Sequence, residues 1–287
     1  MPTAPRWTLK TRSLEFARAP LVMGILNVTP DSFSDGGKHL ALATAVESAL
    51  QMQADGAAII DIGGESTRPY SDPVGVEEEL SRVIPVIEQL KGRLKIPISI
   101  DTSKAEVARQ ALAEGAEIIN DVTGLEGDPA MIKVASQSKA GVCVMHMQGT
   151  PQTMQDRPSY DDVAKDVYRY LKQRKEYCLD AGIDENRICL DPGIGFGKTH
   201  EQNLELLRHM PDFLDLGSPI LIGHSRKGFI AKVIGDSTQD RMAGTLGVTL
   251  AAAVAGMHVV RVHDVLESVQ AIKLFETAGG FTFATQT

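Results

Sequence analysis

The chain of 287 residues contains few cysteines and no long apolar run. Its three cysteines, Cys143, Cys178 and Cys189, include no C-x-x-C pair, so they favour buried, reduced thiols over a disulfide framework. No stretch approaches the roughly 20 apolar residues that a membrane-spanning helix needs. The first residues, MPTAPRWTLKTRSLEF, lack the apolar core of a secretion signal. We therefore expect a cytoplasmic protein without a membrane partner.

Positive charge is also scarce. The sequence has 29 Lys and Arg against 37 Asp and Glu, which gives a net charge of −8. A general nucleic-acid binder needs a basic surface, so no nucleic-acid partner is expected, although a local basic pocket stays possible. The hydrophobic content of 43% and the charged content of 23% are typical of a globular protein with a large core.

Eight short apolar runs occur along the chain, beginning near residues 21, 57, 96, 116, 141, 187, 219 and 258. Each run is continuous rather than alternating, which is typical of parallel strands buried on both faces. Helix-like stretches separate the runs, and each is long enough for a parallel crossover. The alternation predicts an α/β fold: an eightfold (β/α) TIM barrel that forms one domain over residues 1–287. A doubly wound sheet is the rival fold, but it rarely uses eight such even units.

Local patterns predict a few further elements. The runs RWTLK and RSLEF predict a short hairpin within residues 1–20 that closes the bottom of the barrel. The spacing of Val163, Val167 and Leu171 predicts an amphipathic helix. Ser103, followed three residues later by Glu106, is typical of a capping box at a helix start.

Residues 190–203, LDPGIGFGKTHEQN, resemble a nucleotide-binding motif at first sight. A P-loop has four residues between its first glycine and Gly-Lys-Thr, whereas three separate Gly193 from Gly197. A dinucleotide fingerprint has the spacing G-x-G-x-x-G, whereas this stretch has G-x-G-x-G. Neither motif fits, so the glycines predict a sharp turn after a strand. Lys198 is not expected to contact a ligand directly.

Polar side chains occur at the end of every predicted strand, where TIM barrels hold their active sites. These residues are Asn27, Asp61, Asp101, Asn120, Asp121, His146, Asp191, Ser225, Arg226, Lys227, Arg261, His263 and Asp264. A helix cap or an ion pair would explain any one of them. Eight polar strand ends together would place three or more carboxylates near three cations, which favours a site for a charged small molecule.

The charges also separate by strand. The cations follow the seventh and eighth strands, where this fold commonly holds phosphate. The hydrogen-bond acceptors Asp101, Asn120 and Asp191 follow the third, fourth and sixth strands, and they suit the donor-rich edge of an aminopyrimidinone. The pattern predicts a flat nitrogen heterocycle deep in the barrel, with a phosphate group near its rim.

Eight stretches carry a family resemblance. MGILNVTPDSFSDGG, DIGGESTRP, SIDTSKAEV, IINDV, MHMQGTPQTMQ, LDPGIGFGK, SRKG and RVHDV resemble the dihydropteroate synthases, in order, across nearly the whole chain. The resemblance to the bacterial enzymes implies a TIM-barrel transferase of folate biosynthesis (EC 2.5.1.15), from a family that sulfonamides target. Such an enzyme condenses 6-hydroxymethyl-7,8-dihydropterin diphosphate with 4-aminobenzoate to give 7,8-dihydropteroate and diphosphate. The resemblance also implies Mg²⁺ as cofactor and a homodimer.

The resemblance implies roles for the matching residues. The pterin-binding residues would be Asp101, Asn120, Met145, Asp191, Phe196, Lys227 and Arg261. The diphosphate-binding residues would be Asn27, Arg261 and His263, with Asn27 also at the metal. The 4-aminobenzoate-binding residues, on or beside two loops that complete the site, would be Phe33, Thr67, Arg68, Pro69 and Ser225. The catalytic residues would be Asp35, Asp101, Lys227 and Arg261. Tyr70 and His224 match no fixed residue type, so we expect ordinary packing or surface positions for them.

For the reaction we expect a Mg-assisted dissociative substitution, in which diphosphate leaves before the neutral arylamine attacks. Three other functions compete with this one. A methyltetrahydrofolate-dependent methyltransferase would need no diphosphate clamp, a non-catalytic pterin-binding paralogue would show gaps in the clamp or loops, and a sugar-phosphate barrel would not need three deep acceptors. The run GTLGVTLAAAVAGM from residue 244 is apolar on nearly every face. It predicts either a tightly packed outer helix or a dimer contact.

Overall fold

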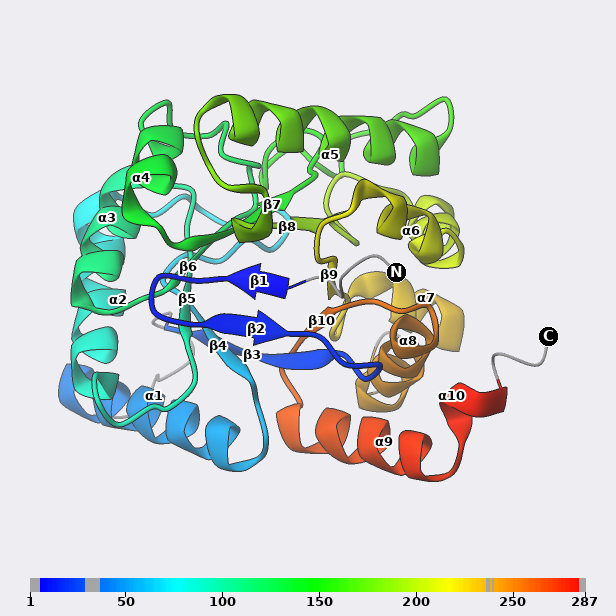
Figure 1. Cartoon of the computed structure of the whole chain (residues 1–287), viewed down its shortest axis with the longest axis horizontal. Coiled ribbons are helices and arrows are strands. Elements are labelled where there is room, and N and C mark those ends of the chain that lie inside the picture. Colours follow the sequence, from blue (N-terminus) through cyan, green and yellow to red (C-terminus); the bar gives the residue numbers. More distant parts are fainter. Residues whose placement is uncertain (1–5, 29–36, 236–237, 239, 284–287) are drawn as a thin grey trace.

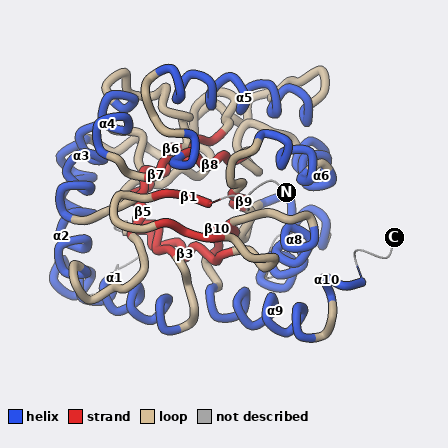
Figure 2. Tube along the Cα trace, viewed as in Figure 1, coloured by secondary structure: helices blue, strands red, loops and turns tan. Residues whose placement is uncertain are grey.

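The computed structural model describes residues 6–28, 37–235, 238 and 240–283. Eight parallel strands lie at its centre, and helices surround them (Figures 1 and 2). The strands are β3 (Leu21–Asn27), β4 (Ile59–Gly63), β5 (Ile98–Asp101), β6 (Ile118–Asp121), β7 (Gly141–Met145), β8 (Ile188–Asp191), β9 (Leu221–Gly223) and β10 (Val259–Val262). Every predicted apolar run contains one of these strands.

Helices connect successive strands on the outside of the sheet (Figure 2). The α-helices are α1 (Gly37–Ala54), α2 (Val76–Leu90), α3 (Ala105–Glu114), α4 (Met131–Ser138), α5 (Val163–Asp180), α6 (His200–Arg208), α7 (Gly228–Ile234), α8 (Met242–Val254), α9 (Val265–Thr277) and α10 (Gly280–Phe283). Two 3₁₀ helices, η2 (Glu185–Arg187) and η3 (Met210–Leu216), precede β8 and β9. None of the helices in the described part of the chain is long and apolar enough to cross a membrane.

The strand order closes the sheet into a barrel. Neighbouring strands pair in the order β8-β7-β6-β5-β4-β3-β10-β9. The two end strands meet through a parallel bridge between Leu190 and Ile220, and the Leu190 N–H donates to the Pro219 carbonyl at 2.9 Å. The TIM-barrel prediction is therefore confirmed, with its weakest seam between β8 and β9. All strand ends named above then lie at one face of the barrel.

The predicted hairpin is present at the opposite face. Strands β1 (Arg6–Thr8) and β2 (Ser13–Glu15) pair antiparallel and lie across the barrel strands in Figure 1. Trp7, Leu9 and Phe16 are buried in one apolar cluster with residues near the strand starts. Those residues are Met23, Ile59, Ile118, Cys143, Cys189, Leu221 and Val259. The Trp7 Nε1–H donates to the Arg187 carbonyl at 2.8 Å, which satisfies the one polar atom of a fully buried indole.

Two local predictions have different outcomes. The amphipathic helix is α5, whose N-cap Asp162 accepts a hydrogen bond from the Lys165 N–H. The capping box at Ser103 is wrong, because α3 begins at Ala105 after Lys104 and has no side-chain cap of its own. Asp128, on the loop between β6 and α4, instead accepts from the Ala105 N–H at 2.9 Å. The carboxylate of Asp128, 23 residues away in sequence, thus caps the helix in place of the Ser103 hydroxyl.

The packing of the β1–β2 hairpin against the barrel gives a stability prediction. Trp7→Ala should lower the free energy of unfolding by about 3–5 kcal/mol, because it leaves a large cavity and an unpaired Arg187 carbonyl. Urea unfolding followed by far-UV circular dichroism measures this, since Trp7 is the single tryptophan and its fluorescence is lost. Arg6→Ala, at an exposed position of the same hairpin, is the control. Equal stability of the two variants would contradict this packing role.

Candidate active site

A pocket of about 1320 Å³ opens at the carboxyl-terminal face of the barrel. It is lined by ten of the residues assigned above: Asn27, Thr67, Arg68, Pro69, Asp101, Phe196, Ser225, Lys227, Arg261 and His263. Met145, Asn120 and Asp191 are buried at neighbouring strand ends. Phe33 and Asp35 lie outside the described residues. One cavity therefore brings together residues from the first barrel strand, β3, to the last, β10.

Arg261 is the cation at the floor of this pocket. Its Nε donates to Asp61 Oδ2 at 2.6 Å, and a terminal nitrogen donates to Asp101 Oδ2 at 2.6 Å. Burial opposes the positive charge, but the two carboxylates outweigh burial and raise the pKa of Arg261 above its ordinary value. The guanidinium is therefore charged and held in one plane by two fixed acceptors.

Asp61 had no role assigned from the sequence. It is fully buried, and the same Oδ2 that accepts from Arg261 also accepts from Asn120 Nδ2 at 3.1 Å. Its Oδ1 has no hydrogen-bond partner among the described residues. Asp61 thus orients both Arg261 and Asn120. A carboxylate inside a buried apolar strand was the available signal, but the partners of Asp61 are 59 and 200 residues away in sequence.

The glycine-rich turn after β8 fixes the carboxylate of Asp191. Gly193, Gly195 and Gly197 all have positive φ, and an added Cβ at Gly193 or Gly197 would overlap a backbone oxygen of the segment after β7. The Gly193 N–H donates to Asp191 Oδ1 at 2.7 Å. The glycines therefore make a sharp turn, as predicted, and the turn also orients a buried acid.

Lys198 holds this turn from within. Its Nζ lies 2.8 Å from the carbonyls of Gly193 and Phe196 and 2.9 Å from His146 Nδ1. Burial lowers the pKa of Lys198 well below its ordinary value and lowers that of His146 to about 2. Lys198 borders the pocket, but its amine is occupied by acceptors of its own loop. This geometry agrees with the expectation that Lys198 is not a direct ligand.

Lys227 faces the same turn from the other side. Its Nζ donates to the Ile194 carbonyl and lies 4.1 Å from the centre of the Phe196 ring. Burial lowers the pKa of Lys227 to about 7, while nearby Asp191 works in the opposite direction. Lys227 and Phe196 therefore form one wall of the pocket, with a cation–π contact between them.

The two predicted ring-binding acids share an unusual electrostatic environment. Burial raises the pKa of Asp101 to about 7, against the effect of Arg261. Burial also raises the pKa of Asp191, against the Gly193 N–H and the charge of Lys227. Both acids are thus costly to keep charged without a ligand. A cationic or donor-rich partner would relieve that cost.

Ser225 and His263, which follow β9 and β10, contact each other in the pocket. Ser225 Oγ accepts from the His263 N–H at 3.2 Å and lies 3.0 Å from His263 Nδ1. Burial, followed by the effect of Arg261, lowers the pKa of His263 to about 4, so this imidazole is neutral at pH 7. Tyr70 lies exposed at the pocket edge, whereas His224 is fully buried against Thr245 and Thr249 of α8.

The described residues offer few metal ligands. They contain no group of three or more His, Cys, Asp or Glu residues that could hold a metal ion. Asn27, at the end of β3, lines the pocket and provides a neutral amide oxygen. Such a sparse oxygen site fits Mg²⁺, which commonly uses one or two protein ligands together with substrate phosphates and water.

The glycine turn gives a matched prediction. Gly193→Ala should cost about 1–2 kcal/mol for the positive φ and roughly 1–3 kcal/mol more for displacing the His146 carbonyl. Gly182→Ala, which also has positive φ but open space around a new Cβ, should show only the first cost. Urea unfolding of both variants measures the difference. Equal losses would contradict close packing of this turn.

Comparison with known proteins identifies the family of this chain. Residues 23–263 match the family of pterin-binding enzymes. The chain is 48% identical over 257 residues to the dihydropteroate synthase of Escherichia coli (strain K12), over 90% of this chain and 91% of that protein. The Xanthomonas albilineans dihydropteroate synthase with 4-aminobenzoic acid has a TM-score of 0.89 and 44% identity, covering 96% of this chain and 98% of that chain.

A second structure of the Xanthomonas albilineans enzyme, in complex with 7,8-dihydropteroate, has a TM-score of 0.85 and 42% identity. It likewise covers 96% of this chain and 98% of that chain. The family match covers most of the chain, and the 48% identity to the Escherichia coli protein is too high to reflect a shared fold alone. The chain belongs to the dihydropteroate synthases, the transferases of EC 2.5.1.15 that form dihydropteroate.

Proposed function

We propose that the pocket binds the dihydropterin diphosphate at its floor and 4-aminobenzoate at its rim, and joins them with release of diphosphate. The observation that supports this most is the position of Arg261 between Asp61 and Asp101, at 2.6 Å from each. A flat guanidinium beside acceptors suits a ring that carries amino donors on one edge and a diphosphate on its side chain.

Asp101, Asn120 and Asp191 bind the donor edge of the pterin in this proposal. Asp191 uses one oxygen for Gly193 and leaves the other for ligand. Asp101 pairs with Arg261 through one oxygen only. Met145 and Phe196 provide apolar walls, and Lys227 donates to the ring. A cationic or amino-substituted ring would stabilise both buried carboxylates in their charged form.

Arg261, His263 and Asn27 bind the diphosphate. The pKa of His263, lowered to about 4 mainly by burial, makes this residue a neutral hydrogen-bond donor rather than a cation at pH 7. Asn27 would also hold Mg²⁺ through its amide oxygen. When bound, the metal would neutralise charge on the leaving diphosphate.

The residues of this chain then favour a dissociative path. Arg261 stabilises the negative charge that grows on the departing diphosphate. The buried carboxylates of Asp101 and Asp191 offset the positive charge that remains on the pterin methylene. The arylamine is neutral at pH 7, so no strong base is needed to activate it. Asp35 would orient the amine or accept its proton.

Five residues would form the aminobenzoate site: Phe33, Thr67, Arg68, Pro69 and Ser225. Thr67, Arg68 and Pro69 belong to the loop after β4, and Ser225 follows β9. Arg68 carries the positive charge that a benzoate carboxylate needs. The loops would exclude water, which would otherwise capture the cationic intermediate.

We further propose that residues 1–287 act as one cytoplasmic domain within a homodimer. All three cysteines are buried free thiols, as a reducing compartment favours. The dimer proposal is supported by exposed apolar side chains at neighbouring helices: Val233 and Ile234 of α7, 61% and 42% exposed, and Val254 of α8, 46% exposed.

Replacing Asp101 tests the ring-binding role. Asp101→Asn keeps the shape but removes the charge, so both turnover and affinity for the pterin diphosphate should fall by at least tenfold, about 1.4 kcal/mol. Burial raises the pKa of Asp101 to about 7, so protonation of Asp101 should weaken pterin binding as pH falls from 8 to 6, whereas Lys227, whose pKa burial lowers to about 7, gains charge over the same range. Isothermal titration should therefore show that the variant lacks the part of the affinity loss that Asp101 causes. Unchanged turnover and affinity would contradict the role.

The reaction path is tested by measuring diphosphate release with and without 4-aminobenzoate. A dissociative step predicts slow release from the pterin diphosphate alone, since water can capture the intermediate. Arg261→Ala should abolish that release and weaken binding of the pterin diphosphate by about 1–3 kcal/mol. Release that strictly requires the arylamine would favour direct displacement instead.

A further inference from the structure

The loop after β4, residues 64–75, is pinned at both of its ends. Glu65 Oε1 accepts from the Val74 N–H at 2.8 Å, which closes the loop on itself. The Arg82 guanidinium of α2 donates to the Gly64 carbonyl at 2.6 Å. Within the loop, Ser71 Oγ donates to the Ser66 carbonyl at 2.5 Å. Hydrogen bonds therefore hold both ends of the loop, and the residues between them line the pocket.

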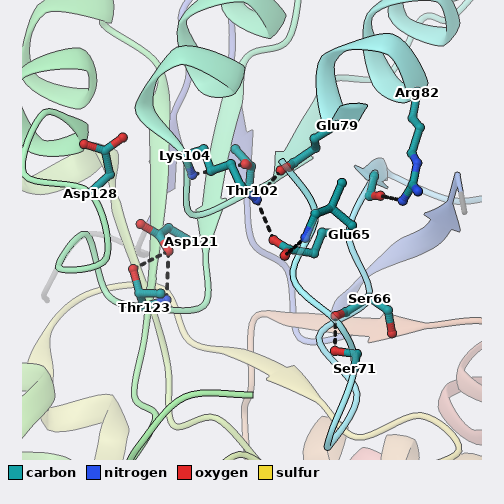
Figure 3. Close-up of polar contacts among 12 residues, drawn as sticks. Glu65, Ser66, Ser71, Glu79, Arg82, Thr102, Lys104, Asp121, Thr123 and Asp128 are labelled. Atoms are coloured by element: carbon teal, nitrogen blue, oxygen red, sulfur yellow. Dashed lines mark hydrogen bonds and ion pairs between the residues drawn. The ribbon is translucent and has the colours of Figure 1, made fainter. Parts of the chain in front are cut away.

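The other carboxylate oxygen of Glu65, Oε2, belongs to an ion cluster formed by Glu65, Lys104 and Glu79 (Figure 3). Lys104 Nζ lies 2.6 Å from Glu65 Oε2 and 2.6 Å from Glu79 Oε2, and Figure 3 shows it between the two acids. Glu79, on α2, is fully buried, and the side chains of Lys104 and Glu65 are about one-fifth exposed. Burial acts against the charge of Lys104, but its hydrogen bonds to both glutamates raise its pKa. The ammonium is therefore charged at neutral pH.

Lys104 also belongs to the segment that follows β5. It comes three residues after Asp101, and its N–H donates to Thr102 Oγ1 at 3.2 Å. A second pocket of about 270 Å³ lies beside the cluster and is lined by Glu65, Thr67, Asp101 and Lys104, among others. Asp101 and Thr67 line both pockets. The cluster thus links the strand end proposed to bind the pterin with the loop proposed to bind 4-aminobenzoate.

We propose that Lys104 and Glu65 are positioning residues, which set where Thr67, Arg68 and Pro69 meet the second substrate relative to Asp101. The inference rests on the proposed function of the two subsites. Neither residue touches substrate in this account. Three charges that are mostly withdrawn from water cost desolvation, and well-packed apolar residues could stabilise the same loop. The directional contacts of Lys104 with Glu65 and Glu79 instead fix the position of the loop at residues 64–75 relative to the end of β5.

Glu65→Gln is the principal test. It removes one charge without changing the side chain's size, and it leaves the Lys104–Glu79 pair in place. We expect the KM for 4-aminobenzoate to rise by roughly tenfold to a hundredfold, because a displacement of about 1 Å is that costly. The affinity for the pterin diphosphate should change by less than threefold. Lys104→Met should show the same split, and Lys104→Arg should restore part of the loss.

Lys175→Met is the matched control. Lys175 is a similarly buried lysine of α5, which pairs with Glu185 at 2.7 Å and the Leu216 carbonyl at 2.7 Å, and it lines neither pocket. This variant should lose stability and keep its KM for 4-aminobenzoate. An unchanged KM in Glu65→Gln, or equal effects on both substrates, would overturn the positioning role. Absence of activity in the parent enzyme would instead overturn the proposed function.

Discussion

The buried contact of Arg261 with Asp61 and Asp101 is the interaction on which the site depends. One cation satisfies two acids on strands β4 and β5, and Asp61 holds Asn120 of β6 through the same oxygen. Removing any partner from such a group leaves a buried charge unpaired, which costs several kcal/mol. The barrel supplies the frame, because only its parallel strands bring these positions to one face. Arg261 and Asp61 therefore hold the side chains of three neighbouring strands in one group.

The turn after β8 supplies a second constraint. Its glycines let the chain pass close to the segment after β7, the Gly193 N–H donates to Asp191, and the carbonyls of Gly193 and Phe196 accept from Lys198. The Lys198 amine contacts the carbonyls of this turn and His146, which explains how a lysine in a glycine-rich loop can be structural. The orientation of Asp191 and the position of Phe196 both follow from it. The stretch from Gly193 to Lys198, which resembles a phosphate-binding loop, thus orients the carboxylate of Asp191.

Much of the fold was predictable from the sequence, because eight continuous apolar runs with polar ends specify a barrel and its working face. The residues gathered in the pocket were predictable for the same reason, since strand order brings all strand ends together. Asp61 was not assigned a role, because its partners Asn120 and Arg261 are distant in sequence. The expected cap at Ser103 failed because Asp128, from another loop, satisfies the helix start. Lys104 carries no local signal either, since both its acids come from other segments.

If Asp61 acts through Arg261, the two side chains should be coupled in a double-mutant cycle. Affinity for the dihydropterin diphosphate would be measured by isothermal titration for the parent, Asp61→Ala, Arg261→Ala and the double variant, because alanine leaves neither the acceptor nor the donor of this contact. We expect a coupling free energy of about 1–3 kcal/mol, because the second substitution finds the contact already broken. Additive effects within about 0.5 kcal/mol would instead show that Asp61 and Arg261 act independently.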